Sequence, residues 1–246
     1  MILPAAALSA PERHHAGAHV AGTHSRRAAE AYGPNVPLNQ DSSMTTAPGR
    51  AALSLPSTVP LFLNRWSPRA FIDAPMSHDE LTAILEAARW APSAYNSQPW
   101  RFLCARRGTP EWENFLSWLV PFNQSWAGKA SVLIYVASRT VMLSPSGNLV
   151  PATTHEFDAG AAAMLLQLQA AHLGWATHAM SGFDVEAAHK GLAAPEDFRI
   201  HAAIAIGKQG PSDMLPEGLR PRETPSDRAP LATLAWEGTF EGHNEP

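Results

Sequence analysis

The sequence predicts a single α+β domain in which helices cover a sheet. The chain has 246 residues, of which 45% are hydrophobic and 16% are charged, so it can bury one sizeable core. From about residue 61 onward, segments with helical periodicity alternate with short runs rich in β-branched and aromatic residues. Interleaved segments of these two kinds favour a sheet packed under helices.

Start and stop signals predict three longer helices and one short one. A capping residue opens each of the longer three, and a Pro or a Gly ends the first and the third. The expected segments are residues 77–90, with Ser77 and Glu80 as a capping box; residues 109–119, with Thr109 before Pro110; residues 153–173, with Thr153 and Glu156 as a second box; and residues 185–191. The third is apolar and Ala-rich nearly all round, so we expect it to be a buried central helix.

Strands are expected where short apolar runs lie between turn signals. These runs are residues 101–105, 132–138, 175–180 and 201–207. From Lys208 onward the chain is Pro-rich, weakly periodic and long for a loop in a compact monomer. Such a segment favours an arm that lies on another surface.

Charge and cysteine content exclude several classes of protein. Lys plus Arg number 18 against 22 for Asp plus Glu, which gives a formal charge of -4, and no basic block indicates binding to nucleic acid or to an anionic membrane. The one cysteine, Cys104, allows no internal disulfide and no Cys cluster for a metal. No apolar run approaches the ~20 residues needed to span a bilayer. We therefore expect a soluble, cytoplasmic protein without a metal.

The amino-terminal part has a different composition. Residues 1–56 are rich in Ala, Pro, Gly, Ser and His and show no helix or strand periodicity, so we expect a disordered extension before a single domain at residues 57–246. The opening apolar run has no basic residue before it, so export is not expected. Met44 could serve as an ordinary start. Residues up to about Pro56 are expected to be dispensable for ligand binding.

Several common catalytic motifs are absent. The sequence contains neither the G-x-G-x-x-G of dinucleotide-binding folds nor a P-loop, and "HEFDA" lacks the second His of a zinc helix. His178, Ser181 and Asp184 lie close together in the sequence, but a hydrolase triad there rests on proximity alone, without G-x-S-x-G around the serine. Cys104 falls in an expected strand and is more simply a small buried side chain than a nucleophile.

Two polar, turn-rich clusters flank the first expected helix. "RWSPRAF" (residues 65–71) combines two arginines and a serine, a set that can surround the oxygens of a phosphate. "PSAYNSQPW" (residues 92–100) carries Asn96 and Gln98, whose amides can meet a heterocycle that has both donors and acceptors. Together they indicate a mononucleotide with a planar ring. The alternative is that the serines cap turns and the arginines are solvated.

Six blocks, taken in order, carry a resemblance to a known family. They are "RWSPRAF", "AARWAPSAYNSQPWRF", "NQSWAGKASVLIYVA", "DAGAAAMLLQLQAAHLGWATHAMSGFD", "IAIG" and "SDRAPL". In this order and spacing the chain resembles the FMN-dependent nitroreductase family over about residues 60–240. The resemblance implies a mixed sheet flanked by helices, FMN as cofactor, NAD(P)H as co-substrate, and a homodimer with flavin sites at the interface. If the loop "APSAYNSQP" binds flavin, the tryptophans on either side of it, Trp90 and Trp100, are expected to pack in the core.

The resemblance also assigns individual residues. Arg65, Ser67 and Arg69 match a motif that holds the FMN phosphate and ribityl chain and approaches the ring, with Trp66 between them; Pro92, Ser93, Ala94 and Asn96 match a flavin loop contributed by the other subunit; Asn123 matches an amide on the pyrimidine edge; Met180, Ser181 and Gly182 match backbone beside flavin N5; Arg228 matches a late phosphate-binding Arg; Tyr95 and Trp126 are placed near substrate. Gln98 stays a cofactor-binding candidate through its amide. A turn-capping Asn123, a strand-ending Gly182 and a surface Arg228 are the alternatives for three of these positions.

Three positions depart from the family pattern. Ala94 stands where many members have a second Ser, Trp126 stands where many have a Lys, and Ser181 replaces an acidic residue found in some. A positive charge near the flavin pyrimidine would stabilise the reduced anion, and Arg69 could carry that role alone.

The family chemistry is ping-pong hydride transfer from NAD(P)H to a small nitroaromatic, quinone or enone-like acceptor. It needs no side chain as general acid or base, so no catalytic residue is assigned. Two alternatives stay open. One is a flavin-dependent oxidase or dehydrogenase that desaturates a small molecule or a modified peptide, and the other is a flavin-binding protein without turnover.

Overall fold

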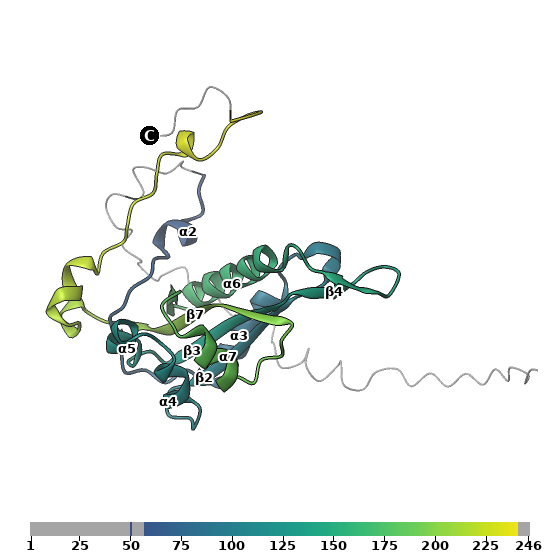
Figure 1. Cartoon of the computed structure of the whole chain (residues 1–246). Helices are drawn as coiled ribbons and strands as arrows, with labels where there is room; N and C mark the ends of the chain where they lie inside the picture. The colour runs from purple at the N-terminus through teal and green to yellow at the C-terminus, as the bar shows by residue number, and fades with distance from the viewer. Residues whose placement is uncertain (1–49, 51–56, 241–246) are drawn as a thin grey trace, which may run out of the picture. The chain divides into compact units, whose positions relative to one another are not determined.

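The computed structural model describes residue 50 and residues 57–240, all within one compact unit, Met44–Pro246. Elements are labelled as in Figure 1. The helices are α2 (Pro60–Asn64), α3 (His78–Arg89), α4 (Trp112–Ser117), α5 (Pro121–Ala127), α6 (His155–His172) and α7 (Val185–Gly191). The strands are β1 (Phe71–Ile72), β2 (Trp100–Arg106), β3 (Val132–Arg139), β4 (Val141–Leu143), β5 (Leu149–Pro151), β6 (Ala176–Met180) and β7 (Phe198–Gln209). The 3-10 helices are η1 (Ala94–Asn96), η2 (Ser212–Met214), η3 (Glu217–Arg222) and η4 (Leu231–Thr233).

The main sheet is built around β7. One edge of β7 pairs with β3, which pairs in turn with β2, and β1 and β6 pair with β7 as well. Every strand pair in the described residues is antiparallel, whereas a mixed sheet was expected. The α+β class is confirmed. Apolar patterning indicates which faces of a strand are buried, but it does not indicate whether the neighbouring strand runs parallel or antiparallel. The sequence of β3 is apolar on both faces, which is typical of a strand in a parallel sheet.

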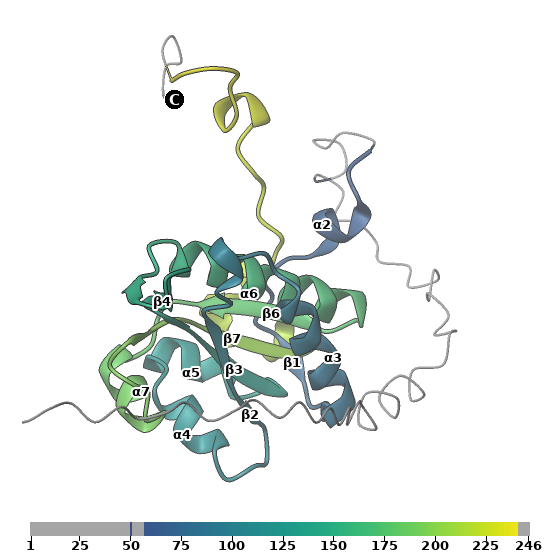
Figure 2. The same ribbon diagram turned by 90° about the vertical axis from the view of Figure 1, so that its right-hand side faces the viewer.

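Helices cover both faces of this sheet (Figure 1). One hydrophobic cluster joins α3 and α6 to alternate residues of β3 and β7, including Ile134 and Ile204. The other joins α4 and α5 to the opposite residues of the same strands, including Tyr135 and Ala203 (Figure 2). Within the described residues, no helix is both long enough and apolar enough to cross a membrane.

The expected helices are all present, but two of their starts differ. Ser77 and Glu80 form the expected capping box on α3, and Gly174 has a φ of +72° at the end of α6. The box expected at Thr153 is wrong, because α6 begins after Thr154, whose hydroxyl donates to Asp158 instead of capping the helix. Similarly, α4 begins at Trp112 and not at Thr109, because residues 109–111 form a turn.

The long helix α6 is not buried all round within one chain. Its inner side packs on the sheet, while Phe157 is 80% exposed and Met164 is also exposed. Its many alanines give little contrast between inner and outer sides, so the sequence pattern did not identify an exposed face.

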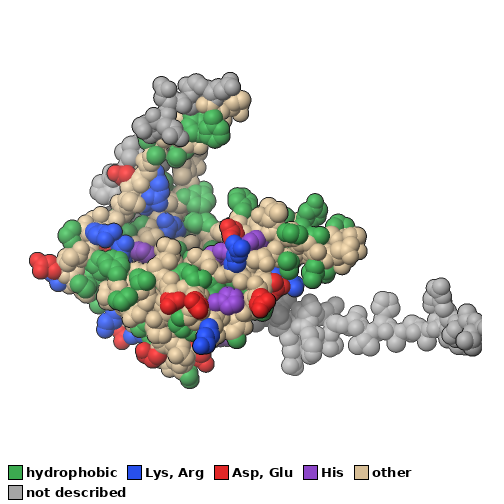
Figure 3. Space-filling view, viewed as in Figure 1, with side chains coloured by type: hydrophobic (Ala, Val, Ile, Leu, Met, Phe, Trp, Pro, Cys, Tyr) green, Lys and Arg blue, Asp and Glu red, His purple; other side chains and the backbone are tan. Residues whose placement is uncertain are grey.

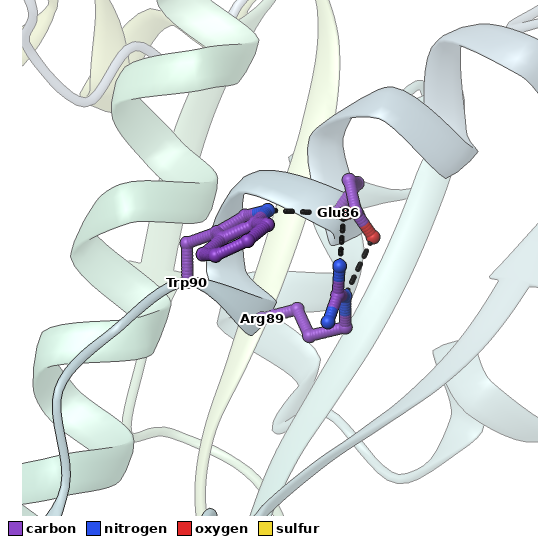
Figure 4. Close-up of polar contacts among 3 residues, drawn as sticks. All are labelled: Glu86, Arg89 and Trp90. Carbon is purple, nitrogen blue, oxygen red and sulfur yellow. Dashed lines mark hydrogen bonds and ion pairs between the residues drawn. The ribbon is translucent and has the colours of Figure 1, made fainter. Parts of the chain in front are cut away.

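Trp90 lies on the surface, and its expected place in the core is wrong. The side chain is 71% exposed, its Nε1 donates to Glu86 Oε1 at 3.0 Å, and the Arg89 guanidinium lies 4.9 Å from the ring centroid (Figure 4). The buried face of α3 includes Ala88, and Ala91, just after the helix, is buried on the same side. Residue 90 lies between them and points away from that face. Trp100 is buried, as expected.

The extension expected over residues 1–56 lies outside the described residues, except for Arg50.

Candidate functional site

A cavity of about 270 Å³ lies where the segment after α2, the strand β6 and the segment after η3 meet. Its lining is unusually basic for a chain with a net negative charge. The lining residues are Arg50, Arg65, Trp66, Ser67, Arg69, His178, Arg222, Thr224, Ser226 and Arg228. In Figure 3, Lys and Arg side chains gather between the segment that carries α2 and the C-terminal segment. We call this space the arginine cavity.

Two side chains hold the walls of the arginine cavity together. Glu223 Oε1 accepts the backbone N–H groups of Arg69 and Ala70 at 2.7 and 2.8 Å. Arg50 donates to the backbone carbonyls of Ser226, at 2.7 and 3.0 Å, and of Leu63 at 3.0 Å. The C-terminal segment is therefore fixed beside "RWSPRAF" by hydrogen bonds to backbone.

Nearby carboxylates, those of Asp227 and Glu223, offset the positive charge of the cavity only in part. In the described part of the chain, none of its five arginines forms a salt bridge. Burial, and after it the charges of Arg228 and Arg50, lower the pKa of the Arg65 guanidinium. Burial and then Arg222 lower the pKa of Arg69, which Glu223 partly offsets. Guanidinium groups held together in this way attract an anion with several acceptor oxygens, such as a phosphate.

His178 forms a neutral part of this wall. Its Nδ1 lies 3.0 Å from the Pro68 carbonyl oxygen, which can only accept, so Nδ1 carries the hydrogen. Burial lowers the pKa of His178 to about 4, and Arg69 and Arg65 act in the same direction while the bond to Pro68 opposes them. The imidazole is therefore neutral at pH 7, and its Nε2 is an acceptor among cationic donors.

Trp126, which was expected near substrate, lies behind the cavity wall. It is 2% exposed, its ring centroid lies 4.6 Å from that of His178, and the Arg69 guanidinium lies 6.0 Å from the ring. The Trp126 indole therefore packs against both His178 and Arg69 on the side away from the cavity. Its Nε1 and Arg69 Nε are both buried without a hydrogen-bond partner in the described residues.

The loop at residues 92–98 is strained. Tyr95, Asn96 and Gln98 have φ values of 52°, 53° and 46°, which non-glycine residues adopt at a cost of about 1–3 kcal/mol each. Ser93 Oγ accepts the Gln98 N–H at 3.0 Å, and the Ala94 N–H donates to Asp158 Oδ2 at 3.2 Å. Tyr95 is 77% exposed. Strain that is maintained in this way is typical of a functional loop.

A further bond joins α5 to the end of β6. Asn123 Nδ2 donates to the Gly182 carbonyl at 2.9 Å, and the Val120 N–H reaches the same oxygen at 3.1 Å. A Cβ at residue 182 would lie 2.7 Å from Asn123 Nδ2, so any larger residue would require the Asn123 side chain to shift. Met180 is buried and Ser181 is exposed beside it.

The structure brings together only part of the residues that the sequence selected. Those lining the arginine cavity are Arg65, Trp66, Ser67, Arg69 and Arg228. Those elsewhere in the chain are Pro92, Ser93, Ala94, Tyr95, Asn96, Gln98, Asn123, Met180, Ser181 and Gly182, of which Tyr95, Asn96 and Gln98 line a separate groove of about 290 Å³ with Arg101, Arg139 and β4.

Sequence reasoning missed Arg50, Arg222, Thr224 and Ser226, although Ser226 begins the "SDRAPL" block and the other two of the last three lie within four residues before it. It considered His178 only as part of a triad. That triad does not form, because His178 bonds Pro68 while Asp184 accepts the Ala187 N–H at the start of α7.

An α+β domain with an arginine-lined cavity suits a phosphorylated ligand, and comparison with known proteins agrees with the sequence resemblance. A profile described as the nitroreductase family matches residues 63–114 and 109–208. The chain belongs to the nitroreductase family.

Similar proteins include a solved structure titled as an oxidoreductase containing FMN, which is 46% identical with a TM-score of 0.74 over 77% of this chain and 96% of that one. A second is a Desulfovibrio desulfuricans protein assigned as a nitroreductase and solved in complex with FMN, with 26% identity and a TM-score of 0.58 over 76% of this chain and 99% of that one. A Bacillus subtilis protein provisionally named as the NAD(P)H nitroreductase YdgI is 44% identical over 61 residues, which are 25% of this chain and 28% of that protein. The match to this last relative thus spans about a quarter of its length.

His178 should make the ligand-free chain less stable as the pH falls. Its folded pKa of about 4 lies below the ordinary 6.5, so between these values the unfolded chain binds the proton more readily and stability is lost on acidification. The loss reaches about 3 kcal/mol near pH 4, because one pKa unit corresponds to about 1.4 kcal/mol. Chemical unfolding at pH 7 and pH 4 gives the loss of unfolding free energy in the unaltered chain and in His178→Gln, whose amide can still donate to the Pro68 carbonyl.

The unaltered chain should lose about that much more stability than His178→Gln between the two pH values. His78→Gln, at an exposed position on α3, is the matched control and should follow the unaltered chain. Equal losses in the unaltered chain and His178→Gln would show that the pKa of His178 is not depressed.

Proposed function

We propose that this protein is an FMN-dependent oxidoreductase that uses NAD(P)H to reduce a small organic acceptor. The observation that carries the proposal is the arginine cavity, in which the R-x-S-x-R residues of a nitroreductase-family chain meet Arg222 and Arg228. The FMN named for two of the similar structures and the NAD(P)H in the name of the curated relative support it.

The residues present fit the phosphate end of FMN. A phosphate monoester carries close to two negative charges, which matches a group of half-buried and exposed arginines that form no salt bridge in the described residues. Arg65, Ser67 and Arg69 all line the same cavity. Arg65 Nη1 lies 3.5 Å from Ser67 Oγ, and Arg69 Nε is a buried donor without a partner in the described residues. Arg65, Arg69, Arg222 and Arg228 would hold the phosphate, with Ser67 and Thr224 as hydroxyl donors.

The neutral acceptor at His178 Nε2 suits a ligand hydroxyl, of which the ribityl chain carries several. The chemistry that FMN supplies when bound is hydride transfer, from NAD(P)H and then to a nitroaromatic, quinone or enone-like acceptor. The chain's own part is to bind and orient, so no described side chain is assigned as an acid or base.

The complete site is proposed to form between two copies of the chain. The strained loop at residues 92–98 lines a different groove from the arginine cavity, so the residues selected for one flavin do not meet within one chain. Tyr95 on that loop, with Trp90 and Phe157 beside it, exposes a large aromatic surface, which favours burial against a partner. The bond from Ala94 to Asp158 holds the loop against α6, on which Phe157 lies.

The proposed activity predicts rapid reduction of bound flavin by a nicotinamide. Under anaerobic conditions, the visible absorbance of the FMN-loaded chain should bleach on adding NADH or NADPH and should return on adding a nitroaromatic or quinone. Free FMN at the same concentration is the control and should bleach far more slowly. Persistent absorbance with both nicotinamides would contradict a reductase. Bleaching by a different reductant alone would instead support the oxidase or dehydrogenase alternative.

The shared site predicts complementation between two damaged chains. Arg65→Ala removes a phosphate ligand and Asn96→Ala alters the loop, so each homodimer should bind FMN weakly. A mixed dimer would hold one site with both changes and one site with neither, so mixing under exchange conditions should restore part of the FMN binding. Flavin fluorescence quenching measures the recovery. No recovery, after subunit exchange has been demonstrated, would mean that each flavin is held within a single chain.

A further inference from the structure

Arg50 lies outside the part of the chain that matches the family, yet it borders the arginine cavity. Its Nε and Nη2 both donate to the Ser226 carbonyl oxygen, at 3.0 and 2.7 Å. Its Nη1 donates to the carbonyl oxygens of Leu63 and Arg65, at 3.0 and 3.2 Å. One side chain therefore bridges two backbone segments, each of which carries a cavity arginine.

The first segment is the end of α2. The last carbonyls of a helix have no partner within the helix, and a cation there also meets the negative end of the helix dipole. The last turn of α2 contains no basic residue of its own, and the chain leaves it in an extended conformation at Arg65. Arg50 thus supplies the cation that this end lacks, at the point where the backbone turns to place Arg65.

The second segment carries Arg228. Arg228 Nη1 donates to the Ser226 carbonyl at 3.2 Å, to Ser226 Oγ at 3.1 Å and to the Asp227 carbonyl at 2.9 Å. The Ser226 carbonyl is therefore shared by Arg50 and Arg228, so the position of Arg50 also sets that of the Arg228 guanidinium.

Most of the N–H groups of Arg50 donate hydrogen bonds to these backbone carbonyls. A guanidinium has five N–H groups, and four are used in these contacts, which leaves one on Nη2. A direct bidentate bond from Arg50 to a phosphate is therefore excluded in this arrangement. Its effect on an anion in the cavity must come mainly through the placement of Arg65 and Arg228, with its own charge as a smaller contribution.

We propose that Arg50 is a positioning residue for the phosphate of the cofactor: it ties the end of α2 to the segment at residue 226 and so holds Arg65 and Arg228 at one anion. The inference rests on the proposed function, because the anion is the FMN phosphate. It also moves the functional boundary of the domain. A chain that begins at Met44 keeps Arg50, whereas one cut at residue 57, the boundary expected from composition, does not.

Substitution of Arg50 in the full chain tests the proposal. Arg50→Ala should weaken FMN binding by about ten- to a hundredfold, which is the range for loss of charge-assisted hydrogen bonds, while riboflavin, which lacks the phosphate, should change by less than about threefold. Arg50→Lys restores the charge but not the planar fork that reaches three carbonyls, so it should recover only a small part of the loss. Fluorescence titration with FMN and with riboflavin gives both affinities.

Arg107→Ala is the matched control, since it removes one arginine that pairs with Asp73 and that lines neither the arginine cavity nor the groove at the loop of residues 92–98. It should leave both affinities unchanged. Unchanged FMN binding in Arg50→Ala would overturn the proposal, and so would equal losses for FMN and riboflavin, which indicate general misfolding. Full recovery in Arg50→Lys would reduce the role to charge alone and would also overturn positioning. Failure of the unaltered chain to bind either flavin would instead contradict the proposed function.

Discussion

The concentration of positive charge in one partly buried cavity is the constraint on which the rest of this structure depends. Five guanidinium groups border the space, and burial together with mutual repulsion lowers the pKa values of Arg50, Arg65 and Arg69. The nearby carboxylate of Glu223 is used to hold backbone N–H groups and forms no salt bridge in the described residues. Hydrogen bonds to backbone maintain this cavity, and the proposed function assigns to it the anion that would complete it.

The rest of the fold can be understood as support for that cavity and for a second, separate feature. The sheet and α5 place His178 and Trp126 behind the arginines, where one stays neutral and the other packs beneath Arg69. At a different place the strained loop at residues 92–98 is fixed to α6 through Asp158. The proposal of a site shared by two chains joins these features, because each carries residues suited to one part of a flavin.

The sequence predicted features that depend on neighbouring residues and missed those that depend on distant ones. The α3 capping box, the end of α6 at Gly174 and the core strands follow from local signals, and so does the grouping of Arg65 and Arg69 at one cavity, whose phosphate role stays a prediction. The short elements α5 and β1, and the hairpin of β4 and β5, carry too few residues to show a period. Arg50 lies in a segment without helix or strand periodicity and bonds to a residue 176 positions away, which no local pattern reveals.

The measurement that tests this account most directly compares two ligands of the unaltered full chain. Chain stripped of flavin is titrated with FMN and with riboflavin, at low and at high salt. If the arginines hold the phosphate, FMN should bind at least about a hundredfold more tightly than riboflavin, and the advantage should shrink as salt screens the charges. Equal affinities for the two flavins at both salt concentrations would contradict the assignment of the arginine cavity to the FMN phosphate.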